Sequence, residues 1–310
     1  MFSKKIRKKI IAAVSVAVLI FCLVIEIGQL VPGLGIPGWD DLFAGAGFSS
    51  TPIVPEGELQ VYFIDVGNAD AILIRQGEVN ALIDAGERGD GDDILAFLRN
   101  HGVEKLDLVV ATHPHADHIG GMADVINGIP VDTFVMSYMP EEETPTSSTY
   151  LNMLTALDEK NVAVDEAKPG RVYTLGTAQL TVLAPLTESD EANNISVVTR
   201  LTFGDRSFLF MGDAETAVEK QLLSDGVSLA ADVIKVGHHG SSTSSSHAFL
   251  SRVAPDYAII PCGEGNSYDH PHAEVLTRLE ALNTTIYRSD VHGHIAVTTD
   301  GQKLTISTQK

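Results

Sequence analysis

Basic residues are scarce in this sequence. The chain of 310 residues contains 21 Lys and Arg against 41 Asp and Glu, which gives a formal net charge of -20. Five of the basic residues, Lys4, Lys5, Arg7, Lys8 and Lys9, precede everything else, so the remainder is still more acidic. Tight, sequence-independent binding of duplex nucleic acid needs many cations against the phosphates and is therefore disfavoured. Nucleic acid as a transient substrate is not excluded.

Cysteine is also scarce. The two cysteines, Cys22 and Cys262, lie in segments that are not expected to meet, so no internal disulfide framework is predicted. The cellular compartment therefore has to be inferred from the N-terminus instead.

An apolar run at residues 10–25 directly follows the basic cluster and contains no charge. Continued as a helix to residue 31, it would be about 30 Å long at roughly 1.5 Å per residue, enough to cross a bilayer core. Because basic flanks stay inside the cell, we predict a cytoplasmic segment at 1–9, a single transmembrane anchor at 10–31 and an extracytoplasmic remainder. The alternative is a cleaved signal peptide with a site near Ala44-Gly45-Ala46, which would make the protein secreted.

Residues 32–57 are rich in Gly and Pro and are predicted to be a linker before a folded domain at 58–310. Strands are expected where short β-type runs end at turn residues, namely at 59–65, 71–75, 79–84, 106–112, 131–136, 179–184, 196–203, 207–211, 232–236 and 257–261. Helices are expected at 92–101, 119–127, 147–160, 214–224, 247–253 and 272–282. Strands mixed with helices on both faces predict a layered α/β sandwich.

The strongest local signal is the segment 113–118, which reads HPHADH and follows an apolar strand. Residues two apart project to one side where a strand ends, so His113 and His115 can bind one ion. Asp117 and His118 follow at the turn into a helix and can bind a second ion beside it. Imidazole and carboxylate ligands suit transition metals better than calcium or magnesium. We therefore predict two divalent transition-metal ions, zinc first, with manganese as the alternative.

This His-x-His-x-Asp-His segment resembles the signature of the metallo-β-lactamase superfamily. Further segments narrow the resemblance: FIDVGNAD at 63–70, LIDAG at 82–86, FMGDAE at 210–215, VGHHGS at 236–241 and HP at 270–271. Their order is similar to that in the C-terminal metallo-hydrolase domain of the ComEC family of DNA-uptake proteins. The resemblance covers roughly residues 58–300 and implies a four-layer αββα sandwich. It does not include the membrane channel of that family, so it implies no transport role.

The resemblance also implies roles for residues late in the chain. Asp213 would bridge the two ions, although the residues alone equally allow it to be a helix cap. His270 would be the last ligand of the second ion, with His239 as the competing candidate. His238 or His239 would then act as a general acid or bind a substrate phosphate, unless His238 only forms a structural hydrogen bond to the Ser-rich loop at 241–246.

A departure from the family affects the first ion. The family usually supplies a third histidine to this ion before the bridging aspartate, but the matching stretch here, 193–196, reads NNIS. Either Asn194 offers a carbonyl oxygen or water fills the position, so we expect the first ion to be held more weakly. Asp65 and Asp84 end adjacent strands and are expected either to accept hydrogen bonds from the metal-binding histidines or only to end their strands.

Two close ions can hold hydroxide at neutral pH and clamp the oxygens of a displacement at phosphorus. With Asp117 orienting the nucleophile, the sequence predicts an extracytoplasmic phosphodiesterase or nuclease that acts on DNA or a smaller nucleotide substrate. One alternative is hydrolysis of a small lactone, thioester or β-lactam. Another is a non-catalytic, metal-stabilised DNA-binding module, which the absence of the third histidine would explain. The membrane is the partner of the N-terminal helix, and no protein partner can be inferred.

Overall fold

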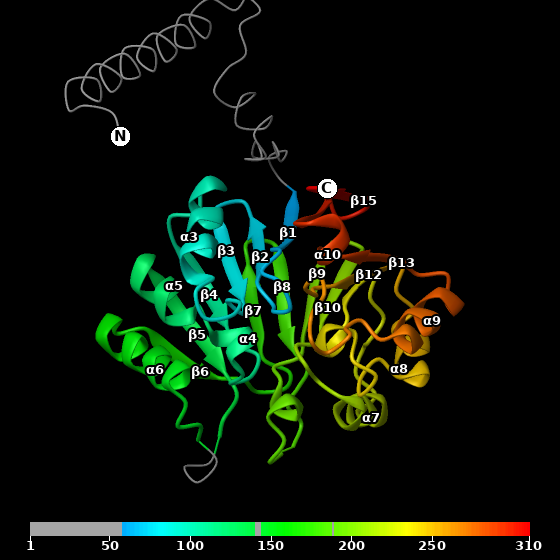
Figure 1. Cartoon of the computed structure of the whole chain (residues 1–310). Helices are drawn as coiled ribbons and strands as arrows, with labels where there is room; N and C mark the ends of the chain where they lie inside the picture. The colour runs from blue at the N-terminus through cyan, green and yellow to red at the C-terminus, as the bar shows by residue number, and fades with distance from the viewer. Residues whose placement is uncertain (1–57, 140–143, 188) are drawn as a thin grey trace, which may run out of the picture. The chain divides into compact units, whose positions relative to one another are not determined.

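Two β-sheets lie face to face at the centre of the computed structural model, which describes residues 58–139, 144–187 and 189–310 (Figure 1). The first sheet contains β1 (Leu59–Phe63), β2 (Ile72–Gln76), β3 (Val79–Ile83), β4 (Leu106–Val110), β5 (Val131–Met136), β6 (Ala163–Glu166), β14 (Ile295–Thr299) and β15 (Leu304–Thr308). These strands lie in the order β15-β14-β1-β2-β3-β4-β5-β6. The described part of the chain therefore begins and ends in the same sheet.

The second sheet is built from the middle and later parts of the chain. Its strands are β7 (Val172–Leu175), β8 (Ala178–Val182), β9 (Thr199–Phe203), β10 (Arg206–Phe210), β11 (Val233–Lys235), β12 (Tyr257–Ile260) and β13 (Thr285–Arg288). They lie in the order β13-β12-β11-β10-β9-β8-β7. The outer face of each sheet is covered by its own set of helices.

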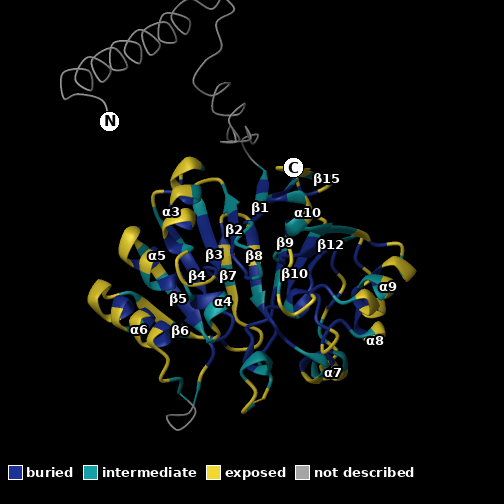
Figure 2. Ribbon diagram, in the orientation of Figure 1, coloured by how far each residue is buried: buried dark blue, intermediate teal, exposed yellow. Residues whose placement is uncertain are grey.

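Helices cover the outer faces of both sheets, and their own outer surfaces are exposed (Figure 2). The first sheet is covered by α3 (Gly91–Asn100), α5 (Met122–Gly128) and α6 (Ser148–Lys160), and the second by α7 (Thr216–Asp225), α8 (His247–Val253) and α9 (Ala273–Ala281). The remaining helices are α4 (Ala116–Ile119), α10 (Ser289–His292), η3 (Ala192–Ile195) and η4 (Gly237–Gly240). The predicted two-sheet sandwich with helices on both outer faces is confirmed.

Alternation along the strands divides the apolar side chains between three cores. In β1, Val61 and Phe63 face the second sheet, whereas Tyr62 packs under the helices of the first sheet. In β10, Phe208 faces the first sheet and Leu209 packs under the helices of the second. Each fully buried apolar side chain of this size contributes about 1.5–3 kcal/mol to stability. The central core between the sheets fixes how the two halves meet.

Parallel strands occur in both sheets and point their carboxyl ends toward the same edge of the sandwich. Strands β3 to β6 run parallel in the first sheet, and strands β10 to β13 run parallel in the second. Loops that follow the carboxyl ends of parallel strands form the ligand sites of open α/β sheets. Here the loops after β4, β10 and β11 carry most of the predicted metal-binding residues.

The predicted transmembrane anchor at 10–31 and linker at 32–57 lie outside the described residues. Within the described ranges, no helix is long and apolar enough to cross a membrane. Strands β6, β7, β13, β14 and β15 had not been expected from the sequence. A strand was expected at 196–203, but β9 begins only at Thr199. Ser196 and Val197 instead form hydrogen bonds with the loops that carry the site: Ser196 Oγ accepts the amide of Asp213, and the amide of Val197 donates to the carbonyl oxygen of Thr112.

Candidate metal centre

The segment 113–118 leaves β4 and passes directly into the short helix α4, as the sequence predicted. The two glycines that follow it allow this helix to pack closely on the loop after β3. A Cβ atom at Gly120 would lie 2.1 Å from the carbonyl carbon of Glu87, and one at Gly121 would lie 2.6 Å from the carbonyl oxygen of Ala85. Only glycine fits at such distances, and the close packing aims Asp117 and His118 at the loop after β10.

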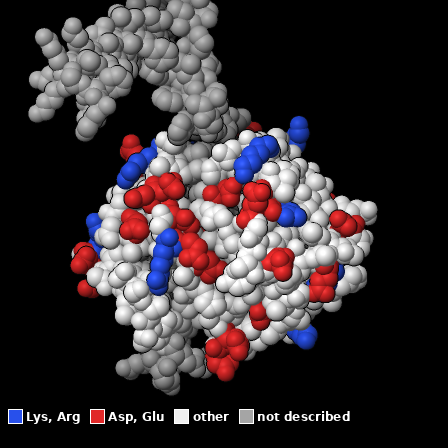
Figure 3. Space-filling view, in the orientation of Figure 1, with Lys and Arg blue, Asp and Glu red and all other residues white. Residues whose placement is uncertain are grey.

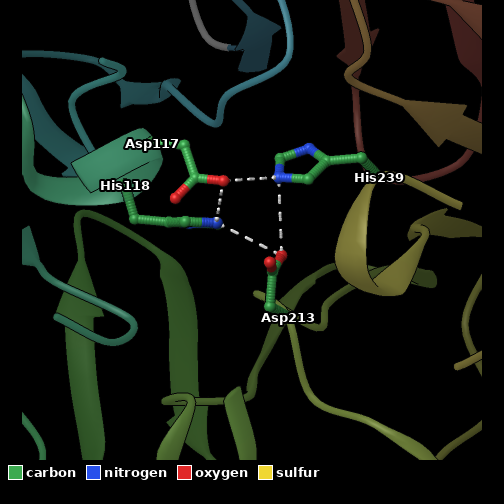
Figure 4. A group of neighbouring side chains, drawn as sticks. All are labelled: Asp117, His118, Asp213 and His239. Atoms are coloured by element: carbon green, nitrogen blue, oxygen red, sulfur yellow. Dashed lines mark ion pairs between the residues drawn. The ribbon is translucent and has the colours of Figure 1, made fainter. Parts of the chain in front are cut away.

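Four side chains from both sheets converge on one point: Asp117, His118, Asp213 and His239 (Figure 4). Each offers a ligand atom, and these atoms all lie within 4.8 Å of one another. His118 Nε2 is 3.2 Å from Asp213 Oδ1, and His239 Nε2 is 3.5 Å from Asp117 Oδ2 and 3.7 Å from Asp213 Oδ1. The set is the imidazole and carboxylate set predicted for the second ion, with His239 in the last position.

Three of these atoms are buried without a hydrogen bond among the described residues: His118 Nε2, His239 Nε2 and Asp213 Oδ1. Buried polar atoms that lack a partner are rare and costly. Three such atoms that converge from three different loops fit a bound cation, because a single ion would satisfy all of them. The donor set therefore suits a divalent transition metal.

Other residues hold the rings of this group in place. Asp84 Oδ2 lies 2.7 Å from His118 Nδ1, and the same carboxylate accepts the amide and the hydroxyl of Thr112. His239 Nδ1 lies 2.9 Å from the carbonyl oxygen of Pro261. An acceptor at Nδ1 fixes the tautomer in which Nε2 is free to bind a metal. Asp84 thus lies where the sequence predicted it, behind a histidine of the motif.

Charges in the group favour ionised carboxylates and a neutral His113. Burial opposes the charged form of Asp213, but the His118 and His239 rings outweigh it and hold the pKa of this carboxyl well below its usual value. Burial, followed by the charge of the His118 ring, holds the pKa of His113 well below its usual value. Burial opposes the charge on the His118 and His239 rings, but Asp213 in turn raises the pKa of both, so a metal ion, which binds the carboxylate and the neutral imidazole, has to displace protons from these two rings.

The residues predicted for the first ion are more open. His113 Nε2 lies 3.0 Å from His115 Nδ1 and 4.0 Å from Asp213 Oδ2. His113 is buried, whereas His115 is exposed. Asp213 consequently presents Oδ1 to the second-ion group and Oδ2 to the first-ion residues, which is the arrangement that a bridging aspartate requires.

Residues 64–264 match the metallo-beta-lactamase superfamily in a comparison with protein families. The chain belongs to the metallo-beta-lactamase superfamily. The fold is similar to that of CmlA, a diiron beta-hydroxylase from Streptomyces venezuelae, with a TM-score of 0.53 at 15% identity. That similarity covers 78% of this chain and 54% of CmlA, and it concerns the fold alone.

The chain is also similar to curated proteins of the ComEC family of competence proteins. The chain is 31% identical to ComE operon protein 3 of Bacillus subtilis over 77% of its own length and 33% of that protein. It is 28% identical to competence protein ComA of Neisseria gonorrhoeae, over 91% of this chain and 39% of ComA. The chain thus spans about a third of the length of these relatives.

In the stretch where the superfamily usually provides a third histidine, this chain has Asn194. The side-chain amide of Asn194 takes part in a hydrogen bond away from the metal-binding residues. Asn194 Oδ1 accepts the backbone amide of Glu215 at 3.3 Å, next to the start of α7. The neighbouring Asn193 donates its side-chain amide to Glu215 Oε1 at 3.3 Å. The sequence prediction that Asn194 offers its oxygen to a metal therefore competes with an existing hydrogen bond.

His239 and His270 occupy positions opposite to those that we expected. The sequence favoured His270 as the last ligand and His239 as a general acid, but the four-ligand group includes His239 and not His270. The ring of His270 stacks on that of His239 with centroids 6.2 Å apart, and its other face stacks on exposed Tyr268 at 5.6 Å. Burial, followed by the charges of His239 and His238, lowers the pKa of His270 to about 4.

The two expected supporting aspartates differ. Asp65 lies 3.7 Å from Lys310 Nζ and accepts the amide of Gly67 at 3.4 Å, so the hydrogen bond to a metal-binding histidine that we expected is not among its described contacts. Asp65 lies two residues beyond the end of β1, so the strand-ending use that the sequence left open stays a prediction. Of these two aspartates, only Asp84 lies behind a histidine of the motif.

Sequence reasoning missed a buried ion pair at the site. Lys235 Nζ lies 2.5 Å from Asp70 Oδ2 and 3.6 Å from Asp213 Oδ1, and it donates to the carbonyl oxygen of Gly212 at 2.7 Å. Burial opposes the charge on Lys235, but Asp70 and Asp213 outweigh it and raise the pKa of the ammonium group. A lysine in the middle of the apolar strand at 232–236 was the signal that could have revealed this pair.

The loop after β11 places two histidines at the site through an unusual backbone. His238 and His239 both have φ near +50°, in the left-handed region. That conformation costs roughly 1–2 kcal/mol for each non-glycine residue. The Ser244 hydroxyl donates to the carbonyl oxygen of Gly237, and the His238 amide donates to that of Gly212, so the surrounding loops hold the turn.

Proposed function

We propose that this protein is a binuclear metal-dependent phosphodiesterase that hydrolyses single-stranded nucleic acid or a smaller nucleotide substrate. The observation that carries the proposal is the group of Asp117, His118, Asp213 and His239, in which three buried atoms lack hydrogen bonds. Two divalent ions bound there and at His113 and His115, zinc or alternatively manganese, would activate a water molecule and offset the charge of a phosphodiester.

The residues of the chain would divide the remaining work. Asp117 Oδ2 faces His239, which leaves the second carboxylate oxygen of this partly exposed residue to orient the attacking water. Asp84 and the carbonyl of Pro261 keep the rings of His118 and His239 in one tautomer. His270 lies at the edge of the group, where its ring can donate a hydrogen bond to a substrate oxygen.

Surface charge and one exposed aromatic side chain support a short or single-stranded substrate. Asp and Glu outnumber Lys and Arg on the face drawn in Figure 3, and a long duplex would meet too few cations. Tyr268 is 65% exposed and stacks on His270, so its free face can take a base. The relatives include proteins named for competence and recombination, which supports a nucleic-acid substrate.

A panel of substrates tests this function. The full-length protein, purified in detergent and stripped of metal, is given zinc or manganese and then single-stranded DNA, duplex DNA, RNA, a chromogenic phosphodiester, a lactone and a β-lactam. We expect metal-dependent turnover of the phosphodiesters, with single-stranded DNA ahead of duplex. Turnover of only the lactone or β-lactam would replace the phosphodiesterase by the other hydrolase, and metal binding without any turnover would favour a binding module.

We also propose that residues 10–31 anchor the protein in the cell membrane with residues 58–310 outside. The basic residues before the apolar run support this orientation. We expect the full-length protein to sediment with membranes and protease added to intact cells to degrade the domain. A domain protected from protease would contradict the proposed topology, and a soluble extracellular form would favour the cleaved signal peptide.

A further inference from the structure

We propose that His238 supplies the third imidazole of the first metal site, in place of the histidine that Asn194 replaces. The inference rests on the proposed two-metal function and concerns which of the chain's own residues complete the more open site. The sequence had left His238 open between contact with the substrate and a structural hydrogen bond to the Ser-rich loop at 241–246. Four observations on the described residues lead to the different role.

The first observation is the symmetry around Asp213. Oδ1 of this carboxylate is faced by His118 Nε2 at 3.2 Å and His239 Nε2 at 3.7 Å. Oδ2 is faced by His113 Nε2 at 4.0 Å and His238 Nε2 at 3.7 Å. Each oxygen therefore has one imidazole from the loop after β4 and one from the loop after β11. His239 completes the second group, and His238 stands in the equivalent place in the first.

The second observation is how the His238 ring is held. Its Nδ1 lies 3.2 Å from the hydroxyl of Thr243 and 3.4 Å from Glu215 Oε1, and its Nε2 points to Asp213. His118 and His239 are held in the same manner, with Nδ1 against an oxygen and Nε2 toward Asp213. A carboxylate or carbonyl at the other ring nitrogen is the usual support of a metal-binding histidine.

The third observation concerns Asn194, which stands where the family has its histidine. Its oxygen accepts the amide of Glu215, and the side chain of Glu215 in turn faces the ring of His238. Asn194 therefore holds Glu215, and Glu215 in turn supports the ring of His238, the proposed ligand. This arrangement leaves His238 as the imidazole that approaches Asp213 Oδ2 from the second sheet.

The fourth observation is the backbone. His238 and His239 are consecutive residues with φ near +50°, a conformation that is uncommon for residues other than glycine. The double turn aims both rings at the same carboxylate. A site with metal–nitrogen bonds of about 2.0–2.1 Å places neighbouring ligand atoms about 3.4 Å apart, so the 4.0 Å from His113 Nε2 and the 3.7 Å from His238 Nε2 to Asp213 Oδ2 require both rings to move inward when an ion binds.

The test is a metal titration of the full-length protein in detergent, using zinc or cobalt added to the metal-free chain and followed by calorimetry. We expect two equivalents for the wild type. His238→Gly should weaken the first site at least about tenfold and leave the second equivalent unchanged, as His113→Ala should also do. The metal-free His238→Gly protein should melt no lower than the wild type, because glycine adopts positive φ freely. A purely structural role would instead lower its melting temperature.

The matched control is His270→Ala, which removes a neighbouring imidazole and should keep both equivalents. Wild-type affinities for both ions in His238→Gly would overturn the inference and return His238 to substrate contact. Loss of the first ion in His270→Ala would overturn it in favour of His270. Should the glycine variant fail to fold, His238→Asn, which also tolerates positive φ, gives the same test. A wild type that binds no ion would contradict the proposed function itself, which is a separate result.

Discussion

The two halves of the metal centre differ in how deeply they are built into the fold. In the second-ion group, His118, His239 and Asp213 are almost fully buried, and Asp84 and the Pro261 carbonyl fix the rings from behind. On the first-ion side, His115 is exposed and the His238 side chain is 24% exposed. Asp213 faces both sides, so the difference comes from the surroundings of the two groups. The comparison predicts a rigid and an exchangeable metal position side by side.

The largest expected effect is the loss of turnover when the partly exposed carboxylate of Asp117 is removed from the second-ion group. Asp117→Ala should lower the turnover number for a phosphodiester at least roughly a thousandfold, because the oriented nucleophile is lost, at 1.36 kcal/mol for each tenfold. The first-ion residues are untouched and should still bind metal. Turnover and metal content are measured together.

The control for this prediction is Asp158→Ala, which removes an exposed carboxylate from α6, far from the site. It should retain the wild-type rate. Wild-type turnover in Asp117→Ala would assign the activity to a contaminant and remove the distinction between the two halves.

The second prediction concerns the buried pair behind the second-ion group. Lys235→Met leaves Asp70 buried without its partner, which should lower the free energy of unfolding by about 3–5 kcal/mol. Urea unfolding of the metal-free protein measures this change. Lys105→Met is the control: it breaks pairs to Asp107 and Asp132 at a site 44% exposed, and should change the free energy of unfolding far less. Equal losses in both variants would show that burial does not distinguish the two pairs.

A third prediction compares two aspartates, one in the loop after β1 and one directly after β3, two strands that β2 separates. Asp84→Asn removes the acceptor behind His118 and should weaken the second metal site about 10- to 100-fold. Asp65→Asn should leave both metal affinities unchanged, since Asp65 contacts Lys310 and Gly67 instead. Metal titration of the two variants is the measurement. Similar losses in both would contradict the separate roles assigned to them.

The smallest expected effect is a difference between the two ions in the wild type. Because the first-ion ligands are partly exposed, this ion should leave at a chelator concentration at least about tenfold lower than the second. Dialysis against increasing chelator, with metal content measured at each step, should pass through a form with one ion. Simultaneous release of both ions would remove the proposed contrast between a rigid and an exchangeable position.

Much of the fold could be predicted because apolar periodicity and turn residues mark it locally. The helix expected at 147–160 is observed at Ser148–Lys160, and the helix expected at 247–253 is observed at His247–Val253. The edge strand β6 (Ala163–Glu166) was missed because its residues are mostly exposed and show no buried face. Pairing with β5, far from it in the sequence, makes it a strand.

Spacing alone predicted the site only at the segment 113–118, whose residues are adjacent, and Asp213 was predicted from the family resemblance. The structure brings Asp117 and His118 together with Asp213. Which of His239 and His270 joins them depends on the left-handed conformation of His238 and His239, and neither position is a glycine that would indicate a positive φ. The Asp70–Lys235 pair joins the loop before β2 to β11, and no local pattern relates these two segments.

The ligands come from opposite sheets: His113, Asp117 and His118 follow β4, whereas Asp213 and His239 follow strands of the other layer. An ion held by both sets is a cross-link between two halves that otherwise meet through apolar side chains. Because the ion binds only when the two sheets are packed together, it stabilises the folded state in proportion to the logarithm of its concentration. The metal concentration would then determine how stable the two-sheet fold is, as well as whether the site can react.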